Sequence, residues 1–517
     1  MDILSNKEMV AREKEVFRSG LTAAALMEAA GEAMAYRISA LYPNAREFLV
    51  LVGKGNNGGD GLVVARHLAT TGRFIRVALT AAEDQLGELP QSMLERLRTG
   101  GHAEVVEGAD DLEFPGSDGV VIDALLGIQA KGVLRGNLAG VVAKLNAMRA
   151  RNFFRTVALD FPSGLAGFEL GKPESPDGAV ISDVTIAVGF AKEVLCRETL
   201  ADWVGRIEVV PWSDSSNESG SHRILEGHGL SGLLPRRNAL SHKGDFGRLV
   251  IVAGSRGFTG APVLCAQATQ AMGAGLLSIV TRADVADIVA AQAPPEAMIS
   301  GWAPYKEAPQ VVKNASVIVF GPGLGLDEQT VIMLRAVLAI GCPVLIDADG
   351  LNCLAQNPGL LDNINTPVLL TPHPGEMTRL LARKFQLDER EAVIRGFTDQ
   401  YNVTVVLKGT RTLITAYKHP LFINTTGNSG LSTGGSGDTL SGIIGALLSQ
   451  GISPIDTARL GVWLHGHAAD LALTERGCEE GLTPTMLSAH LGAALVSLRS
   501  EAAAPIGLIE RAKELMP

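Results

Sequence analysis

The residues with the clearest chemical potential form a glycine-dense stretch, Gly434-Gly435-Ser436-Gly437-Asp438. Five glycines occur between 430 and 442, and an apolar helical pattern follows. Glycines let consecutive backbone N–H groups point at one spot, so the stretch predicts an anion hole at a helix N-terminus. Asp438 would lie beside that hole and take a proton from a hydroxyl while the loop stabilises a phosphoryl group. The alternative, a turn with Asp438 as a helix cap, needs fewer glycines.

Further polar groups follow other predicted strands in the same half of the chain. Residues 408–412, Lys-Gly-Thr-Arg-Thr, offer cations and N–H donors for nucleotide phosphates. A proline-stiffened loop presents His373 and Glu376, and the histidine could equally be structural. Asp347 and Asp349 follow another strand, where they could order metal-bound water or fix the turn. Ligands of parallel α/β sheets collect beyond the carboxyl ends of the strands, so these segments are expected to meet.

A second polar constellation lies near the N-terminus. Residues 53–58 match GxGxxG between a strand and a helix, but the next strand lacks the terminal acid of a conventional nicotinamide-dinucleotide site. Residues 56–61, Asn-Asn-Gly-Gly-Asp-Gly, carry more polar side chains than a helix cap needs. Asp123, Asp160 and Ser163 follow two later strands. Clustered carboxylate, amide and hydroxyl oxygens predict a binding site and suit a hard cation.

Alternating strands and helices must position both sets of residues. Near-continuous apolar strands in both halves, separated by helical patterns, predict α/β architecture with parallel sheets covered on both faces. Segments 411–416 and 421–424 are expected to pair as an antiparallel hairpin near a sheet edge. The polar, serine-rich stretch 212–222 predicts a linker, dividing the chain into domains at 1–215 and 223–517.

Composition narrows the class of protein further. The chain of 517 residues is 46% hydrophobic and 19% charged, which is typical of a soluble enzyme with two domains. Its net charge of −10 argues against a nucleic-acid partner. Five cysteines without a CxxC pair, and no long uncharged apolar segment, favour a cytoplasmic protein with reduced thiols and no membrane span. An apolar helical pattern over 26–41 hints at a homo-oligomer.

Residues 53–68 together with the motifs IDALLG and LDFPSG resemble the NAD(P)HX epimerase domain, over nearly all of 1–215. That resemblance implies a Rossmann-like three-layer α/β/α fold and conversion between the R and S forms of hydrated NAD(P)H. It implies a potassium site at Asn57, Asp123 and Ser163, with Asp160 as the acid–base residue. Phe161 stands where the family usually has an aliphatic residue. The implied hydrate contacts are Asn57, Gly58, Gly59, Asp60, Gly127, Ile128, Gln129, Ala130, Lys131, Gly132, Val133 and Asp160.

The Gly-Ser-Gly-Asp loop resembles that of ribokinase-like kinases, and the motifs GPGLG, DADGLN, TPHPGEM, LKGTRT and GGSGDT over 240–450 resemble ADP/ATP-dependent NAD(P)H-hydrate dehydratases. This implies a ribokinase-like α/β/α domain that phosphorylates the C6 hydroxyl of the S hydrate and then eliminates phosphate, using magnesium with ADP or ATP. The implied hydrate contacts are Ala261, Gly323, His373 and Asp438. The implied nucleotide contacts are Lys408, Gly409, Thr410, Arg411, Thr412 and Gly437.

Taken together, the two resemblances indicate a bifunctional NAD(P)H-hydrate repair enzyme, an isomerase and a lyase in one chain, acting on NADHX and NADPHX. Two rival interpretations stay open at this point. The second domain could be an ATP-dependent kinase for a small hydroxylated substrate, with a stable phosphate ester as product. The first domain could be a non-catalytic nucleotide-binding module, although its polar loop is intact.

Overall fold

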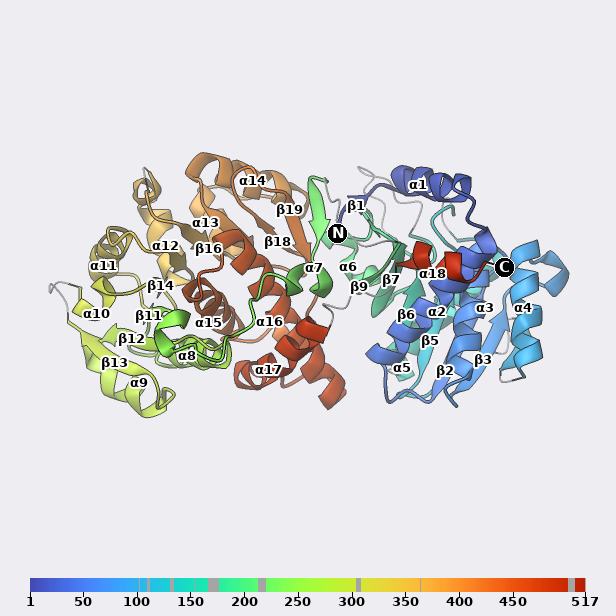
Figure 1. Ribbon diagram of the computed structural model, residues 1–517, viewed down its shortest axis with the longest axis horizontal. Coiled ribbons are helices and arrows are strands. Elements are labelled where there is room, and N and C mark those ends of the chain that lie inside the picture. Colours follow the sequence, from blue (N-terminus) through green and yellow to red (C-terminus); the bar gives the residue numbers. More distant parts are fainter. Residues whose placement is uncertain are drawn as a thin grey trace. The chain divides into compact units, whose positions relative to one another are not determined.

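The computed structural model in Figure 1 describes residues 1–101, 103–108, 112–130, 134–152, 154–165, 176–212, 220–303, 308–362, 364–500 and 507–516. The chain divides into two compact units, residues 1–219 with 504–517 and residues 220–503. Most of the expected linker, 213–219, lies outside the described residues.

The first unit is built on a seven-stranded sheet in which every pairing is parallel. Strand residues alternate between two buried faces: Phe48 and Val50 belong to one apolar core, and Leu49 and Leu51 to another. Burial on both faces explains why these strands read as continuous apolar runs. In sheet order the strands are β4 (Glu104–Glu107), β3 (Phe74–Leu79), β2 (Glu47–Val52), β5 (Val120–Ala124), β6 (Arg155–Leu159), β7 (Val184–Gly189) and β9 (Arg206–Pro211).

Helices cover both faces of this sheet. Helices α2, α3, α4 and α18 contribute to one core, and α5 contributes to the other. Two short strands, β1 (Ile3–Leu4) and β8 (Ala191–Lys192), pair in parallel beside the main sheet. The helices are α1 (Asn6–Arg18), α2 (Ala23–Leu41), α3 (Asn56–Ala69), α4 (Glu88–Gly100), α5 (Gly136–Asn152), α6 (Ala201–Val204) and α18 (Leu508–Glu514).

The structure bears on two sequence-based expectations for this unit. The expected N-terminal arm is α2, whose apolar side chains, such as Ala30 and Met34, are buried in the core of its own unit. It therefore gives no support for self-association. Helix α18 packs on α2, where Arg511 Nε and Nη2 reach the two carboxylate oxygens of Glu32 at 2.8 and 3.0 Å. The C-terminal helix, expected within 223–517, thus belongs to the first unit.

The second unit contains a ten-stranded sheet. Its central strands are parallel, whereas β17–β18 and β18–β19 are antiparallel. The hairpin predicted from the sequence is confirmed as β18 and β19, with β10 beyond it at the edge. In sheet order the strands are β10 (His222–Ile224), β19 (Leu421–Asn424), β18 (Thr412–Thr415), β17 (Thr404–Leu407), β16 (Val368–Leu370), β15 (Val344–Ile346), β14 (Val317–Phe320), β11 (Arg248–Val252), β12 (Leu276–Arg282) and β13 (Met298–Trp302).

The second sheet also lies between helical layers, with α8, α15, α16 and α17 on one face and α11 to α14 on the other (Figure 1). Both units therefore have the predicted α/β/α architecture. The helices are α7 (Gly227–Ser231), α8 (Gly260–Ala271), α9 (Ala286–Gln292), α10 (Gln310–Lys313), α11 (Glu328–Leu338), α12 (Asp349–Gln356), α13 (Pro374–Leu381), α14 (Arg390–Tyr401), α15 (Ser436–Ser449), α16 (Pro454–Arg476) and α17 (Pro484–Ser500).

None of the helices in the described part of the chain is long and apolar enough to cross a bilayer.

Candidate functional site

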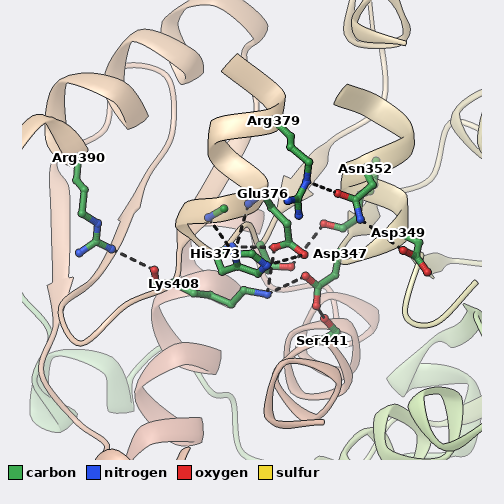
Figure 2. Close-up of polar contacts among 12 residues, drawn as sticks. Asp347, Asp349, Asn352, His373, Glu376, Arg379, Arg390, Lys408 and Ser441 are labelled. Atoms are coloured by element: carbon green, nitrogen blue, oxygen red, sulfur yellow. Dashed lines mark hydrogen bonds and ion pairs between the residues drawn. The ribbon is translucent and has the colours of Figure 1, made fainter. Parts of the chain in front are cut away.

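The carboxyl ends of β15, β16 and β17 bring a buried charge network together in the second unit. Asp347, 2% exposed, accepts from Lys408 Nζ at 2.9 Å through Oδ1 and from Ser441 Oγ at 2.8 Å through Oδ2. Figure 2 shows these side chains converging from three different elements. Lys408 Nζ also lies 3.8 Å from Glu376 Oε2. Burial alone would lower the pKa of Lys408, but the two carboxylates outweigh it and raise the pKa. The ammonium group therefore stays charged at neutral pH.

His373 and Glu376 form a capping box at the start of α13. The backbone N–H of His373 donates to Glu376 Oε2 at 2.8 Å, and His373 Nδ1 accepts from the N–H of Gly375 at 3.0 Å. Burial, with help from the Lys408 charge, lowers the pKa of His373, so the ring is neutral. Nδ1 is an acceptor, which leaves the ring proton on Nε2, and the imidazole is half exposed. This histidine has a structural role as the cap of α13, which is one of the two roles considered for it. Its Nε2–H can still be donated to a ligand.

Asp438 lies in the first turn of α15, beside the same network. Burial raises the pKa of Asp438 to about 7, with the Asp347 carboxylate adding to the increase and Lys408 opposing it. A side chain at position 437 would lie 3.5 Å from Lys408 Nζ, so the glycine there keeps the space between lysine and loop open. A carboxylate half ionised near neutral pH is suited to proton transfer.

A histidine that the sequence analysis did not single out forms a hydrogen bond to the glycine loop. Gly435 has φ 91°, a left-handed conformation that glycine adopts readily, and α15 begins directly after it. His465 on α16 is buried, and its Nε2 lies 3.0 Å from the carbonyl oxygen of Ser436. Burial lowers the pKa of His465 to about 4, so it is neutral and donates this hydrogen bond. A lone histidine within a helical pattern gives no sequence signal for such a role.

Two further predicted hydrate contacts lie side by side. A Cβ atom at Gly323 would come within 3.1 Å of Ala261 and within 2.8 Å of Phe258, so glycine allows the loop after β14 to approach the start of α8 closely. Gly323 also has φ 59°. Next to it, the N–H of Gly325 donates to Asp349 Oδ2 at 2.8 Å. Asp349 therefore fixes this turn, the second of the two roles considered for it.

The predicted nucleotide segment, Lys408 to Thr412, divides by exposure. Gly409 and Thr410 are exposed, but Arg411 is only 3% exposed, so its guanidinium lies within the protein. Arg390 on α14 supports the loop, because its guanidinium donates to the main-chain carbonyls of Leu407 at 3.0 Å and Arg411 at 3.1 Å. It also donates to the carbonyl of Lys408 at 3.2 Å, the bond that Figure 2 shows. Arg390 comes from another helix, and its spacing in the sequence gave no reason to single it out.

In the first unit, the predicted cation ligands meet at the carboxyl ends of β5 and β6. Asp123 is fully buried and accepts from Ser163 Oγ at 2.7 Å and from the N–H of Ser163 at 2.8 Å. Asn57 Nδ2 donates to the Leu126 carbonyl at 3.0 Å, whereas the buried Asn57 Oδ1 has no hydrogen-bond partner among the described residues. Burial raises the pKa of Asp123 to about 6, against its hydrogen bonds. A buried carboxylate beside an unpartnered amide oxygen fits a hard monovalent cation.

Asp160 directly follows β6, and its carboxylate pairs with a lysine that the sequence-based prediction did not include. Lys192 on β8, 0% exposed, donates to Asp160 Oδ1 at 2.5 Å and to the Val188 carbonyl at 2.8 Å. Two other carboxyls face Asp160. Burial, and then the Asp160 charge, raise the pKa of Asp60 well above its usual range and also raise that of Glu13 on α1. Lys192 is thus paired with Asp160, and Asp60 and Glu13 lie within electrostatic reach of that carboxylate.

The glycines of the first binding loop are required by close packing. A side chain at Gly58 would lie 1.9 Å from the carbonyl oxygen of Gly53, and one at Gly59 would lie 2.6 Å from Met27 Sδ. The second expected loop, 127–133, begins beside Asn57. A Cβ atom at Gly127 would lie 3.4 Å from the Cβ atom of Asn57. Gly127, Ile128, Gln129 and Ala130 are described, but Lys131, Gly132 and Val133 lie outside the described residues.

Fold and site together define the second unit as a ribokinase-like enzyme domain that follows a Rossmann-like α/β/α domain. Two family patterns match in the same order: the family described as YjeF-related protein N-terminus matches residues 23–194, and the family described as NAD(P)H-hydrate dehydratase matches residues 249–492.

Similar proteins extend over nearly the whole chain. The bifunctional NAD(P)H-hydrate repair enzyme Nnr of Coxiella burnetii is 34% identical over 503 residues, covering 95% of this chain and 98% of its own. The Nnr enzyme of Escherichia coli is 36% identical over 479 residues, covering 91% and 89%. A solved ADP/ATP-dependent NAD(P)H-hydrate dehydratase from Bacillus subtilis is 29% identical, with a TM-score of 0.46, and covers 53% of this chain and 98% of its own. The chain belongs to the family of bifunctional NAD(P)H-hydrate repair enzymes.

Proposed function

We propose that the chain restores hydrated NADH and NADPH through two active sites, one in each unit. The first site interconverts the R and S epimers of the hydrate, and the second dehydrates the S epimer at the expense of ADP or ATP. The observation that carries the proposal is Asp438, whose pKa is raised to about 7 by burial beside a glycine-rich helix N-terminus. A base of that kind is needed to activate a hydroxyl toward a phosphoryl group.

In the second site, Asp438 takes the proton of the C6 hydroxyl, and the hydroxyl oxygen attacks the terminal phosphorus of the nucleotide. The phosphoanhydride bond to that phosphorus breaks, and AMP leaves when ADP is the donor, or ADP when ATP is the donor. The N–H groups of the loop before α15 stabilise the negative charge of the phosphoryl group in flight. The ring nitrogen lone pair then expels phosphate from C6, and loss of a proton from C5 restores the C5–C6 double bond. Lys408, held by Asp347, supplies a fixed positive charge beside the loop.

Magnesium is expected to accompany the phosphates of the nucleotide. Asp347 is already engaged by Lys408 and Ser441, and Asp349 by the N–H of Gly325. A magnesium ion bound mainly through phosphate oxygens and water fits this arrangement better than an all-protein cage does. Such an ion would neutralise phosphate charge.

In the first site, inversion at C6 requires departure of the hydroxyl as water and its return to the opposite face. Asp160 would give the proton in one direction and take it back in the other. Asp60, whose pKa is raised by burial, would donate a hydrogen bond to the substrate from its protonated form. Asn57, Asp123 and Ser163 would hold potassium, which would balance the buried carboxylate and anchor the first binding loop.

The deciding experiment supplies purified R and S hydrates with ADP or ATP in parallel and follows absorbance in the NADH band. We expect the S hydrate to recover absorbance directly, and the R hydrate to recover it only as fast as it is epimerised. Nucleotide consumption without recovered absorbance would instead identify a kinase that forms a stable phosphate ester. For the first unit, conversion of R to S hydrate is measured without nucleotide, and its absence would make this unit a binding module.

A further inference from the structure

Lys192 is a fully buried lysine whose one hydrogen bond to another side chain, among the described residues, goes to Asp160. It lies on β8, and its Nζ donates to Asp160 Oδ1 at 2.5 Å and to the Val188 carbonyl at 2.8 Å. Its ammonium group also lies 5.9 Å from the centre of the Phe161 ring. An ammonium group is costly to bury unless it is paired and hydrogen-bonded. This pairing with Asp160 therefore accounts for the presence of a charge at this position.

The same pairing distinguishes the two oxygens of Asp160. Oδ1 accepts from Lys192 and, at 3.3 Å, from the N–H of Val188. Oδ2 has no hydrogen bond among the described residues, and the Asp160 side chain is 15% exposed. The backbone contributes as well, because Asp160 has φ 65°, which is uncommon for a residue other than glycine. Its N–H donates to the Ile186 carbonyl at 2.8 Å and holds that turn.

We propose that Lys192 is a positioning residue for epimerisation: it binds Oδ1 of Asp160 so that Oδ2 faces the hydrate and carries the proton. This inference rests on the proposed function of the first unit and names a residue that the motifs did not indicate. Proton transfer needs the carboxylate within hydrogen-bond reach of the leaving hydroxyl. A carboxylate free to rotate would spend much of its time in geometries that cannot react.

The groups that surround the pair explain why a cation is required here. Glu13 on α1 and Asp60 on α3 both interact electrostatically with Asp160, and both have raised pKa values caused first by burial. Lys192 opposes that rise at Glu13. Without the lysine, Asp160 would interact with these two carboxyls and have no paired cation.

The test is a double-mutant cycle on the full-length chain. Lys192→Met, Asp160→Asn and the double variant are compared with the parent for R-to-S conversion, followed by chromatography without nucleotide so that the second site is idle. Lys192→Met is expected to lower kcat by roughly 10–100-fold, part of the 10²–10⁴ that a positioned acid or base supplies. KM should change less than about threefold, because binding is not removed.

Non-additivity is the readout that a purely structural role would not produce. In the Asp160→Asn background, Lys192→Met should change the rate by less than about twofold, because the lysine acts through that carboxylate. Multiplicative effects of the two substitutions, or a parent-like kcat in Lys192→Met, would overturn the inference. A raised KM with unchanged kcat would overturn it too.

Three controls keep the outcome readable. Lys7→Met, an exposed lysine on α1, should leave epimerisation unchanged. Dehydratase turnover of each variant reports that the second unit is intact, and the melting curve reports the first. If Lys192→Met fails to fold, the double-mutant cycle is run with Lys192→Gln, which keeps a hydrogen-bond donor for the Val188 carbonyl. A parent chain that does not convert R to S hydrate would overturn the proposed function itself, which distinguishes that failure from failure of the lysine's role.

Discussion

Replacing Asp438 with asparagine should abolish dehydration while making the second unit more stable. Asparagine keeps the size and hydrogen-bonding capacity of the side chain but cannot accept the hydroxyl proton. Loss of a general base typically costs about 10²–10⁴ in rate, so kcat with S hydrate and ADP should fall by that order. Epimerisation in the first unit should be unchanged.

The gain in stability follows from the raised pKa. Burial raises the pKa of Asp438 from 3.8 to about 7, and each unit is worth about 1.4 kcal/mol. The folded state therefore holds a proton that the unfolded state has already lost, and its stability falls as pH rises between those two values. At pH 8 the penalty approaches about 4 kcal/mol, of which we expect roughly 1–4 kcal/mol to be recovered by Asp438→Asn. Below pH 4 the difference should vanish.

Two measurements check this reasoning. Calorimetry at pH 5 and pH 8 should show a higher melting temperature for Asp438→Asn only at the higher pH, in the transition that ADP shifts. For the parent, kcat/KM should rise roughly tenfold from pH 6 to pH 8, as a base with a pKa of about 7 ionises. Asp399→Asn, at an exposed position on α14, is the matched control. A destabilised Asp438→Asn at pH 8, or a flat pH profile, would refute the assignment.

Three further changes have expected outcomes. Hydrogen bonding by His67, aided by a neighbouring arginine, lowers the pKa of Glu28 to about 2, so its stabilisation is present above the unfolded pKa and is lost as pH falls toward 2. Glu28→Gln should cost roughly 1–3 kcal/mol at pH 7 in urea unfolding, and less than about half as much at pH 3. Gly442→Ala should destabilise the second unit by about 1–3 kcal/mol, because its methyl group would lie 2.2 Å from a main-chain carbonyl of α8, whereas Gly492→Ala meets nothing within 4 Å; equal melting temperatures would contradict this. Asn57→Ala should raise the potassium concentration for half-maximal epimerisation at least about tenfold, measured against tetramethylammonium at constant ionic strength; a potassium-independent parent rate would remove the basis for the site.

Contiguous motifs predicted the larger part of both sites. The glycine-rich stretch ending in Asp438 gives a helix N-terminus with an anion-binding loop, because backbone geometry and the helix dipole follow from local sequence. Continuous apolar strands also predicted two α/β/α units, since a strand buried on both faces has no polar alternation. Asn57, Asp123 and Ser163 do lie together, because the carboxyl ends of neighbouring parallel strands meet at one edge.

The packing of distant segments decided the rest. Lys192 reaches Asp160 across 32 positions of the sequence, and His465 reaches Ser436 across 29. No periodicity or motif marks either partner, since each is a single side chain whose role depends on what the fold places beside it. Helix α18 likewise joins the first unit because its apolar side chains pack on α2. The sequence by itself determined the local elements and the loops proposed to bind ligands, whereas protonation and pairing of the buried charges depend on tertiary burial, which only the folded chain provides.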